Sequence, residues 1–421
     1  MRSQHGDGSG ALRIAAAVAV MLCAGMAAAQ STPMPASASD ICAKDDDDEE
    51  GKAAKPAPLW KRFTFEGACV ELSGSLGATY QKQKAGAGVV SVLTTRKGSV
   101  SGASEVKTAT ADFQIDTRRK TVVGEIKTAF AVKYEKASSD PGNGSATLTE
   151  GLLTWAGIKA GYTDSQMNFW SGDFQFSASA PQRTVGLAGY QFKLNDDWSL
   201  TLAYETGLPT TQAASVKFVT VYPDEPVASA RLSYEADDVS FQLAGLVHEL
   251  RIDGTHPLLA FLGRAAEHSE LGWAATAGLT APAKLGAKGS EFSLQATYAV
   301  NASPYLGTAA DLSSLASTVP VPVTTEGWSV VGSYHFVWSE QWETNVMASH
   351  LALDITLPRA RPSVRTRRYA ANVIWKPVED FKLGAELGYV EAELETGGPL
   401  GLVKGISGRA LAGYLYATVT F

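Results

Sequence analysis

The chain has 421 residues, of which 45% are hydrophobic and 19% are charged, and its formal net charge is −7. This negative balance argues against a nucleic-acid-binding protein, which needs a basic face to neutralise phosphates. After residue 30 no run of about 18 uncharged apolar residues occurs, which excludes a helical membrane protein. A transmembrane barrel remains possible, because its strands present only every second residue to lipid.

The first thirty residues predict a signal peptide. Arg2 and Arg13 precede an apolar run over 14–26, and three alanines at 27–29 provide an A-x-A cleavage site. We expect residues 1–29 to be removed after export through the inner membrane. A short membrane anchor is the alternative, but the apolar run is too short to span a bilayer.

Residues 30–65 predict a flexible periplasmic arm, because Ser, Ala, Pro and Lys surround the acidic run 45–50 and such a composition does not bury a core. Cys23 leaves with the signal peptide. Cys42 and Cys69 then remain, and an even pair in an oxidising compartment suggests one disulfide. Two free thiols or a metal-binding pair are the alternatives.

Residues 66–421 predict one transmembrane β-barrel, because segments of about ten residues alternate with period two. In 381–389, Phe381 and Leu387 fall on the apolar face and Lys382 and Glu386 on the polar face. Aromatic residues often begin and end the apolar face, as in the belts at the two membrane interfaces. The sixteen predicted strands are 67–80, 104–115, 121–134, 148–156, 158–164, 184–193, 198–206, 227–235, 239–248, 271–280, 290–299, 327–336, 342–350, 367–375, 381–391 and 409–421.

The predicted connections alternate between long and short, which is typical of outer-membrane barrels with extracellular loops and periplasmic turns. The predicted long loops are 81–103, 135–147, 165–183, 207–226, 249–270, 300–326, 351–366 and 392–408. The predicted short turns are 116–120, Gly157, 194–197, 236–238, 337–341 and 376–380, and 281–289 is of medium length.

The last strand ends at Phe421, and Val419, Leu415 and Leu411 precede it at alternate positions on the lipid face. Tyr414 lies on the opposite, inward face. A terminal aromatic residue after such a pattern resembles the signal that the outer-membrane assembly machinery reads, so we expect that machinery to be a partner.

Three stretches carry a resemblance to a known family. Residues 67–74 open the first strand with Cys69, residues 113–121 include Asp116-Thr117-Arg118, and residues 155–165 form a short hairpin followed by Phe169 and Trp170. Together they resemble the alphaproteobacterial general porins, closely over the first third of the mature chain and in architecture over most of it. The acidic run departs from that pattern. The resemblance implies homotrimeric channels, an Asp-Thr-Arg turn between the second and third strands, and a third loop, 165–183, that folds into the pore.

A sixteen-stranded barrel is wide enough for a water-filled lumen, so the loop that narrows it sets selectivity. Asp173 on this loop and the neighbouring Asp164 are candidates to face basic residues of the wall. Alternation places further candidate lining residues inward: Glu125, Lys127, Lys133, Arg231, Arg368 and Lys382. Each of them, taken singly, would also serve simply to hydrate the wall.

Five arginines at 359, 361, 365, 367 and 368 are expected near the extracellular rim, where they would attract anions, pair with lipopolysaccharide phosphates or remain solvated. Enzymatic functions are not indicated. The histidines lack metal-ligand spacing, and no H-E-x-x-H, G-x-S-x-G or P-loop motif is present. Ser349-His350 would suit an outer-membrane hydrolase, but no supporting acid is assignable.

The sequence therefore predicts an outer-membrane porin for passive diffusion of small hydrophilic solutes and ions. We expect outer-membrane lipid and lipopolysaccharide as surroundings and no cofactor, metal or nucleic acid. A substrate-specific channel is the nearest alternative. A structural or adhesin barrel whose long loops bind a partner is the second.

Overall fold

The computed structural model of the chain describes residues 62–65, 67–85, 102–140, 142–206, 220–221, 227–236, 238–254, 266–307, 324–356, 361–397 and 406–421. The strands are β1 (Arg62–Phe65), β2 (Ala68–Ala85), β3 (Gly102–Thr121), β4 (Gly124–Ala137), β5 (Ser145–Trp155), β6 (Ile158–Asp164), β7 (Thr184–Lys193), β8 (Trp198–Glu205), β9 (Thr220–Val221), β10 (Val227–Ala236), β11 (Val239–Gly254), β12 (Ala266–Pro282), β13 (Glu291–Val300), β14 (Thr324–Val337), β15 (Trp342–Thr356), β16 (Arg361–Val378), β17 (Phe381–Gly397) and β18 (Ile406–Thr420). Within the described part of the chain, a 3-10 turn, η2 (Ser303–Leu306), follows β13.

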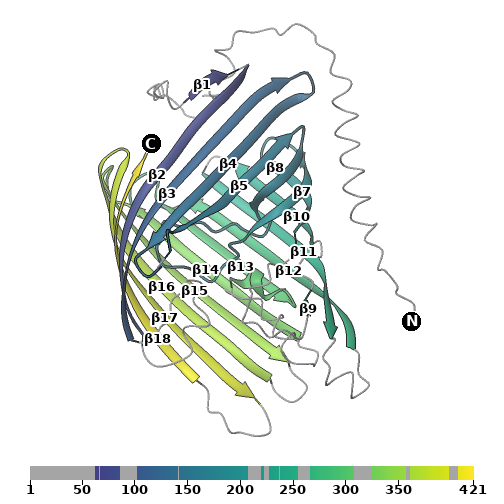
Figure 1. Cartoon of the computed structure of the whole chain (residues 1–421), viewed down its shortest axis with the longest axis vertical. Coiled ribbons are helices and arrows are strands. Elements are labelled where there is room, and N and C mark those ends of the chain that lie inside the picture. Colours follow the sequence, from purple (N-terminus) through teal and green to yellow (C-terminus); the bar gives the residue numbers. More distant parts are fainter. Residues whose placement is uncertain are drawn as a thin grey trace.

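Sixteen of these strands close into one antiparallel barrel, as predicted (Figure 1). Each pairs with its neighbour in the chain, β8 pairs with β10 across β9, and β18 returns to pair with β2. The two remaining strands are short additions. The last residues of the predicted N-terminal arm form β1, which pairs with the start of β2, and β9 pairs with the far end of β11. Closure gives each of the sixteen barrel strands a partner on both sides, which a strand exposed to lipid requires.

The barrel is apolar outside and polar inside, the reverse of a water-soluble sandwich. In β13, Leu294 and Tyr298 are exposed, whereas Ser293, Gln295 and Thr297 are at most 6% exposed. The same alternation recurs in the first half of β15, where Glu343, Asn345 and Ser349 face inward. Farther along β15, Leu351, Leu353 and Ile355 face inward and join a buried apolar cluster. Polar side chains therefore line much of the interior, and apolar side chains form a surface suited to lipid.

No helix formed by the described residues is long and apolar enough to cross a membrane.

Two belts of aromatic side chains encircle much of the outer surface. One belt, near the short turns, comprises Trp198, Tyr234, Phe241, Tyr334, Phe336, Trp338, Trp342 and Trp375, and the other, near the long loops, comprises Tyr204, Trp273, Tyr298, Trp328, Tyr369 and Tyr389. The rings of Trp342 and Trp375 stack 5.9 Å apart on neighbouring strands. Such belts are the expected positions of the two membrane interfaces.

The predicted turn at 116–120 is wrong. These residues belong to β3, and the turn is Val122-Val123, where the Thr121 hydroxyl donates to the carbonyl oxygen of Gly124 at 2.6 Å. Asp116 and Arg118 are polar because they face the lumen, not because the chain turns there. The Asp-Thr-Arg turn implied by the resemblance is wrong for the same reason.

The predicted long loop 351–366 is also wrong, because β15 and β16 continue until only 357–360 lie between them. On the outer face beyond the second aromatic belt, the alternate residues are charged, for example Arg365 and Arg367. In β15 the apolar residues of this part, such as Leu353 and Ile355, are buried inside and Asp354 lies outside, so the outward apolar pattern ends although the strands continue.

The barrel closes where the two ends of the chain meet. The backbone N–H of Phe421 donates to the carbonyl oxygen of Gly74 at 3.0 Å, and the Gly74 N–H donates back to Phe421 at 3.1 Å. The Phe421 ring lies over Gly74, where a Cβ atom would come within 2.7 Å of the ring. Nearby, Cys69 is buried and disulfide-bonded. Cys42, its predicted partner, lies outside the described residues.

Candidate pore and its constriction

The connection between β6 and β7, residues 165–183, lies inside the barrel and is bound to its wall. We call it the constriction loop. Its start is held by Glu205 of β8, whose carboxylate accepts hydrogen bonds from the Ser165 hydroxyl at 2.7 Å and the Gln166 N–H at 2.9 Å. Glu205 is 1% exposed, so these bonds provide the buried charge with hydrogen-bond donors.

The loop next crosses β13 and β14. The Trp170 N–H donates to the side-chain oxygen of Gln295 at 2.9 Å, and the indole N–H donates to the Ser333 hydroxyl at 2.8 Å. Phe169 packs against Gly278 of β12, where a side chain would collide with the ring. Inward-facing amide and hydroxyl groups of the wall therefore accept hydrogen bonds from the loop.

The middle of the loop is held by Glu386 of β17. Its carboxylate accepts the backbone N–H groups of Gln175 at 2.9 Å and Phe176 at 2.6 Å. Asn372 of β16 donates to the Asp173 carbonyl oxygen at 2.6 Å. Glu386 and Asn372 are 3% and 2% exposed, so the loop covers both.

The loop then returns along β16 and β15. Arg368 donates to the Ser177 carbonyl oxygen at 3.1 Å and to the Ser177 hydroxyl at 2.6 Å, and the Ser179 N–H donates to the Ser349 hydroxyl at 3.0 Å. At its end, the Arg183 guanidinium lies 4.8 Å from the centre of the Tyr305 ring of η2. The loop therefore lines the inner wall from β8 to β17.

This path leaves the opposite wall, β2 to β7, largely uncovered. Inward side chains there are accessible: Glu71 is 38%, Arg118 27% and Lys127 55% exposed. Their counterparts beneath the loop, such as Arg368 at 2%, are not. The open part of the lumen is therefore bordered by the constriction loop on one side and by β2 to β7 on the other.

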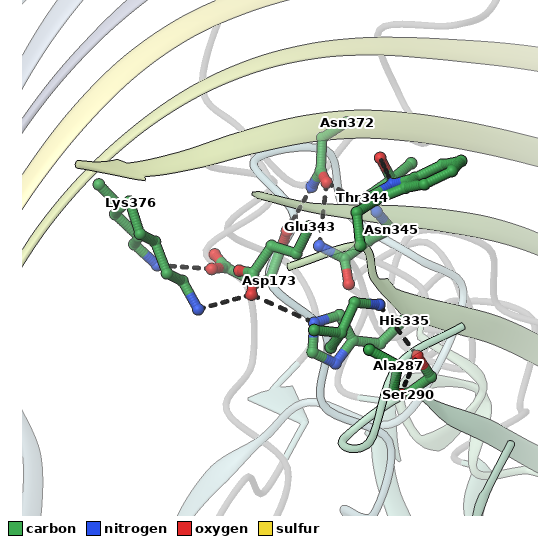
Figure 2. A network of polar contacts seen from close by, with 12 residues as sticks. Asp173, Ala287, Ser290, His335, Glu343, Thr344, Asn345, Asn372 and Lys376 are labelled. Atoms are coloured by element: carbon green, nitrogen blue, oxygen red, sulfur yellow. Dashed lines mark hydrogen bonds and ion pairs between the residues drawn. The ribbon is translucent and has the colours of Figure 1, made fainter. Parts of the chain in front are cut away.

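A polar network connects the loop to the wall near the short turns (Figure 2). Lys382 of β17 pairs with Asp173 at 2.5 Å, and Glu343 of β15 contacts Lys376 at 2.5 Å and His335 at 3.3 Å. Asp173, His335, Glu343 and Lys376 border a cavity of about 380 Å³ beside the loop. The network adds three side chains, at 335, 343 and 376, to the predicted set.

The structure brings some predicted lining residues together. Asp173 pairs with Lys382, and Lys127 pairs with Glu125 at 2.9 Å. Lys133 lies opposite Asp112 on β3. All of these face the lumen.

Other predicted lining residues lie elsewhere. Asp164 ends β6 and interacts electrostatically with Arg231 of β10, whereas Asp173 pairs with Lys382 of β17. Arg368 is beneath the constriction loop and anchors it, so it does not border the open passage. The anchors Glu205 and Glu386 were not predicted as site residues. Alternation places Glu386 inward, but its role depends on the path of the loop.

A family model described as the Porin subfamily matches residues 66–400. The chain belongs to this porin family. No curated protein matches the porin in sequence.

Among solved structures, the porin is similar to the outer membrane channel DcaP of Acinetobacter baumannii, with a TM-score of 0.63 and 18% identity over 85% of this chain and 99% of that one. It is also similar to OprB of Pseudomonas putida, with a TM-score of 0.49 and 10% identity over 84% of this chain and 94% of that one. The anion-selective porin of Comamonas acidovorans gives a TM-score of 0.49 and 10% identity over 84% of this chain and 100% of that one.

The porin is an outer-membrane β-barrel channel for passive diffusion. This function follows from the family membership, together with a closed barrel whose interior is polar. Water-filled barrels admit solutes according to the size and charge of their narrowest part.

Proposed function

We propose that small hydrophilic solutes and ions cross the porin between the constriction loop and the wall formed by β2 to β7. The difference in exposure between the two walls carries this proposal, because the β2 to β7 wall presents accessible charged side chains, whereas the charged anchors Arg368 and Glu386 beneath the loop are buried. The passage is lined by Glu125, Lys127 and Lys133 on the wall and by the Asp173–Lys382 pair at the loop. Opposing charges across a narrow aqueous path orient dipolar solutes.

Cysteine accessibility tests the route. A charged, water-soluble methanethiosulfonate reagent should react with Lys127→Cys and reduce the ionic current. The matched variant Ser329→Cys places a thiol on the inner face of β14, where the native residue is 2% exposed, and should remain unmodified. Equal reaction at both positions, or reaction at position 329 alone, would contradict the proposed route.

We further propose that the porin is a homotrimer of the alphaproteobacterial general type. The resembling stretches 67–74 and 155–165 support this assignment. Close approach of another copy is also favoured by Ala417, Ala78 and Ala109, which occupy directly paired outward positions on β18, β2 and β3. Native mass spectrometry of the detergent-solubilised porin should give three copies, and a monomer would refute the assignment.

The remaining proposals concern export and surroundings. We propose that residues 1–29 are cleaved, that the assembly machinery reads Phe421, and that Cys69 is bonded to Cys42. Arg365 and Arg367, outward-facing beyond the second aromatic belt, are proposed to contact lipopolysaccharide phosphates. Mass measurement of the purified porin, before and after reduction and alkylation, tests the cleavage site and the disulfide.

A further inference from the structure

Two cationic side chains lie near each other on the lumen wall below the start of the constriction loop. Lys159 lies on β6 and Arg231 on β10, within electrostatic range of each other. The register row from Lys159 crosses Gly189 and Ala203 and reaches β10 at Ser229, two residues before Arg231. The wall beside Lys159 is therefore formed by small side chains, which leave room for the long side chains of the two cations.

Neither cation has a direct counter-charge among the described residues. No hydrogen bond and no ion pair within 4.0 Å joins Lys159 or Arg231 to another residue of the described chain. Both side chains are only partly exposed, and the Nε atom of Arg231 is buried without a hydrogen-bond partner. Partly buried charges are normally paired or hydrogen-bonded, so this patch lacks an acceptor.

A third donor lies beside them. Thr201 of β8 is directly opposite Arg231 in the sheet, is 1% exposed, and has a buried hydroxyl without a hydrogen-bond partner. Gln191 of β7 is opposite Thr201 and uses its amide on Ser199 at 3.0 Å. Lys159, Thr201 and Arg231 thus present donor groups to one place on the wall.

The nearby carboxylates do not fill this place. Glu235, Glu205 and Asp164 attract Arg231 only at longer range, and the Glu205 carboxylate is occupied by Ser165 and the Gln166 backbone. They lower the net charge of the patch without supplying an oxygen at hydrogen-bond distance. Binding of an external anion is therefore expected to be weak and reversible, as transit through a channel requires.

We propose that Lys159, Thr201 and Arg231 form a subsite for a small oxyanion, either a phosphate or the carboxylate of a permeating solute. An oxyanion carries several acceptor lone pairs, which suit a guanidinium, an ammonium and a hydroxyl together. The subsite rests on the proposed channel function, because the ligand reaches it through the lumen. It lies just below the point where the constriction loop leaves the wall.

Ionic current through the purified, full-length porin in planar bilayers tests the subsite, with inorganic phosphate as the probe at constant ionic strength. Phosphate should reduce the current of the natural chain saturably. Arg231→Gln and Lys159→Gln should each raise the half-inhibiting concentration about tenfold, because a charge-assisted hydrogen bond is lost. Thr201→Val, which changes no charge, should raise it about threefold through loss of a neutral hydrogen bond.

Lys120→Gln is the matched control, since it removes one exposed positive charge at the short-turn end of β3, outside the patch. It should keep the half-inhibiting concentration of the natural chain. The subsite is overturned if Arg231→Gln responds like the natural chain, or if Lys120→Gln shifts as far as Arg231→Gln. A carboxylate such as acetate, compared with phosphate, identifies which oxyanion is preferred. A complete lack of current steps would instead refute the channel, whereas steps insensitive to phosphate refute only the subsite.

Discussion

Removing the Glu386 carboxylate should detach the middle of the constriction loop. In Glu386→Gln, one of the two carboxylate oxygens becomes an amide NH₂, which faces the N–H of Gln175 or Phe176 and no longer accepts it. Hydrogen bonds to charged groups contribute about 1.5–3 kcal/mol each. Loss of one and weakening of the other therefore cost about 2–4 kcal/mol, which raises the detached population of this segment by about 30- to 1000-fold.

Single-channel recording measures this effect as open-channel noise and as the voltage at which the channel closes. Glu386→Gln should increase the noise and lower the closing voltage, because the detached segment of the loop then moves within the lumen. Asn372 and Arg368 still hold the parts of the loop on either side of it. Glu393→Gln is the control, since it lies on the same strand but on the outer face beside Arg367. If Glu386→Gln and Glu393→Gln both behave like the natural chain, the carboxylate does not hold the loop.

Three further substitutions test other parts of the structure. Gly74→Val places a Cβ atom within 2.7 Å of the Phe421 ring, so the folded fraction after refolding should fall. Heat-modifiable electrophoretic mobility measures this fraction, and normal folding would contradict the closure described. Leu243→Arg puts a charge on the outer face between the belts, which should lower the free energy of unfolding in lipid vesicles by about 2–4 kcal/mol, and an unchanged value would show that this face does not meet lipid. Gly278→Val would bring a Cβ atom to 2.1 Å from the Phe169 ring, so the displaced loop should change the conductance of a barrel that still folds; unchanged conductance would mean that the ring does not sit there.

Most of the barrel is predictable because lipid and water impose opposite demands on alternate residues. Where both aromatic belts and a polar inner face are present, as in β13, the predicted and observed strands agree within one residue at each end. The agreement fails where the outer face leaves the membrane, as at Arg365 and Arg367, because the outer face is then charged and apolar residues such as Leu353 face inward. It also fails at Val122-Val123, where two β-branched residues form the turn and give no turn signal.

The pore is less predictable than the barrel. Alternation shows that Glu386, Arg368 and Lys127 point inward, but it does not tell which of them the constriction loop covers. That depends on contacts over nearly two hundred residues of sequence, such as the bond between Arg368 and Ser177, separated by 191 positions. Long-range pairing of this kind leaves no local pattern, so an anchor and a lining residue look alike in the sequence.

Conductance of single porin channels in a planar bilayer tests the central claim that the barrel encloses a continuous aqueous path. The account predicts discrete current steps whose size rises in proportion to the conductivity of the bathing salt solution. A lumen sealed by the constriction loop would give no steps above the lipid background. That result, obtained with correctly folded protein, would contradict the account.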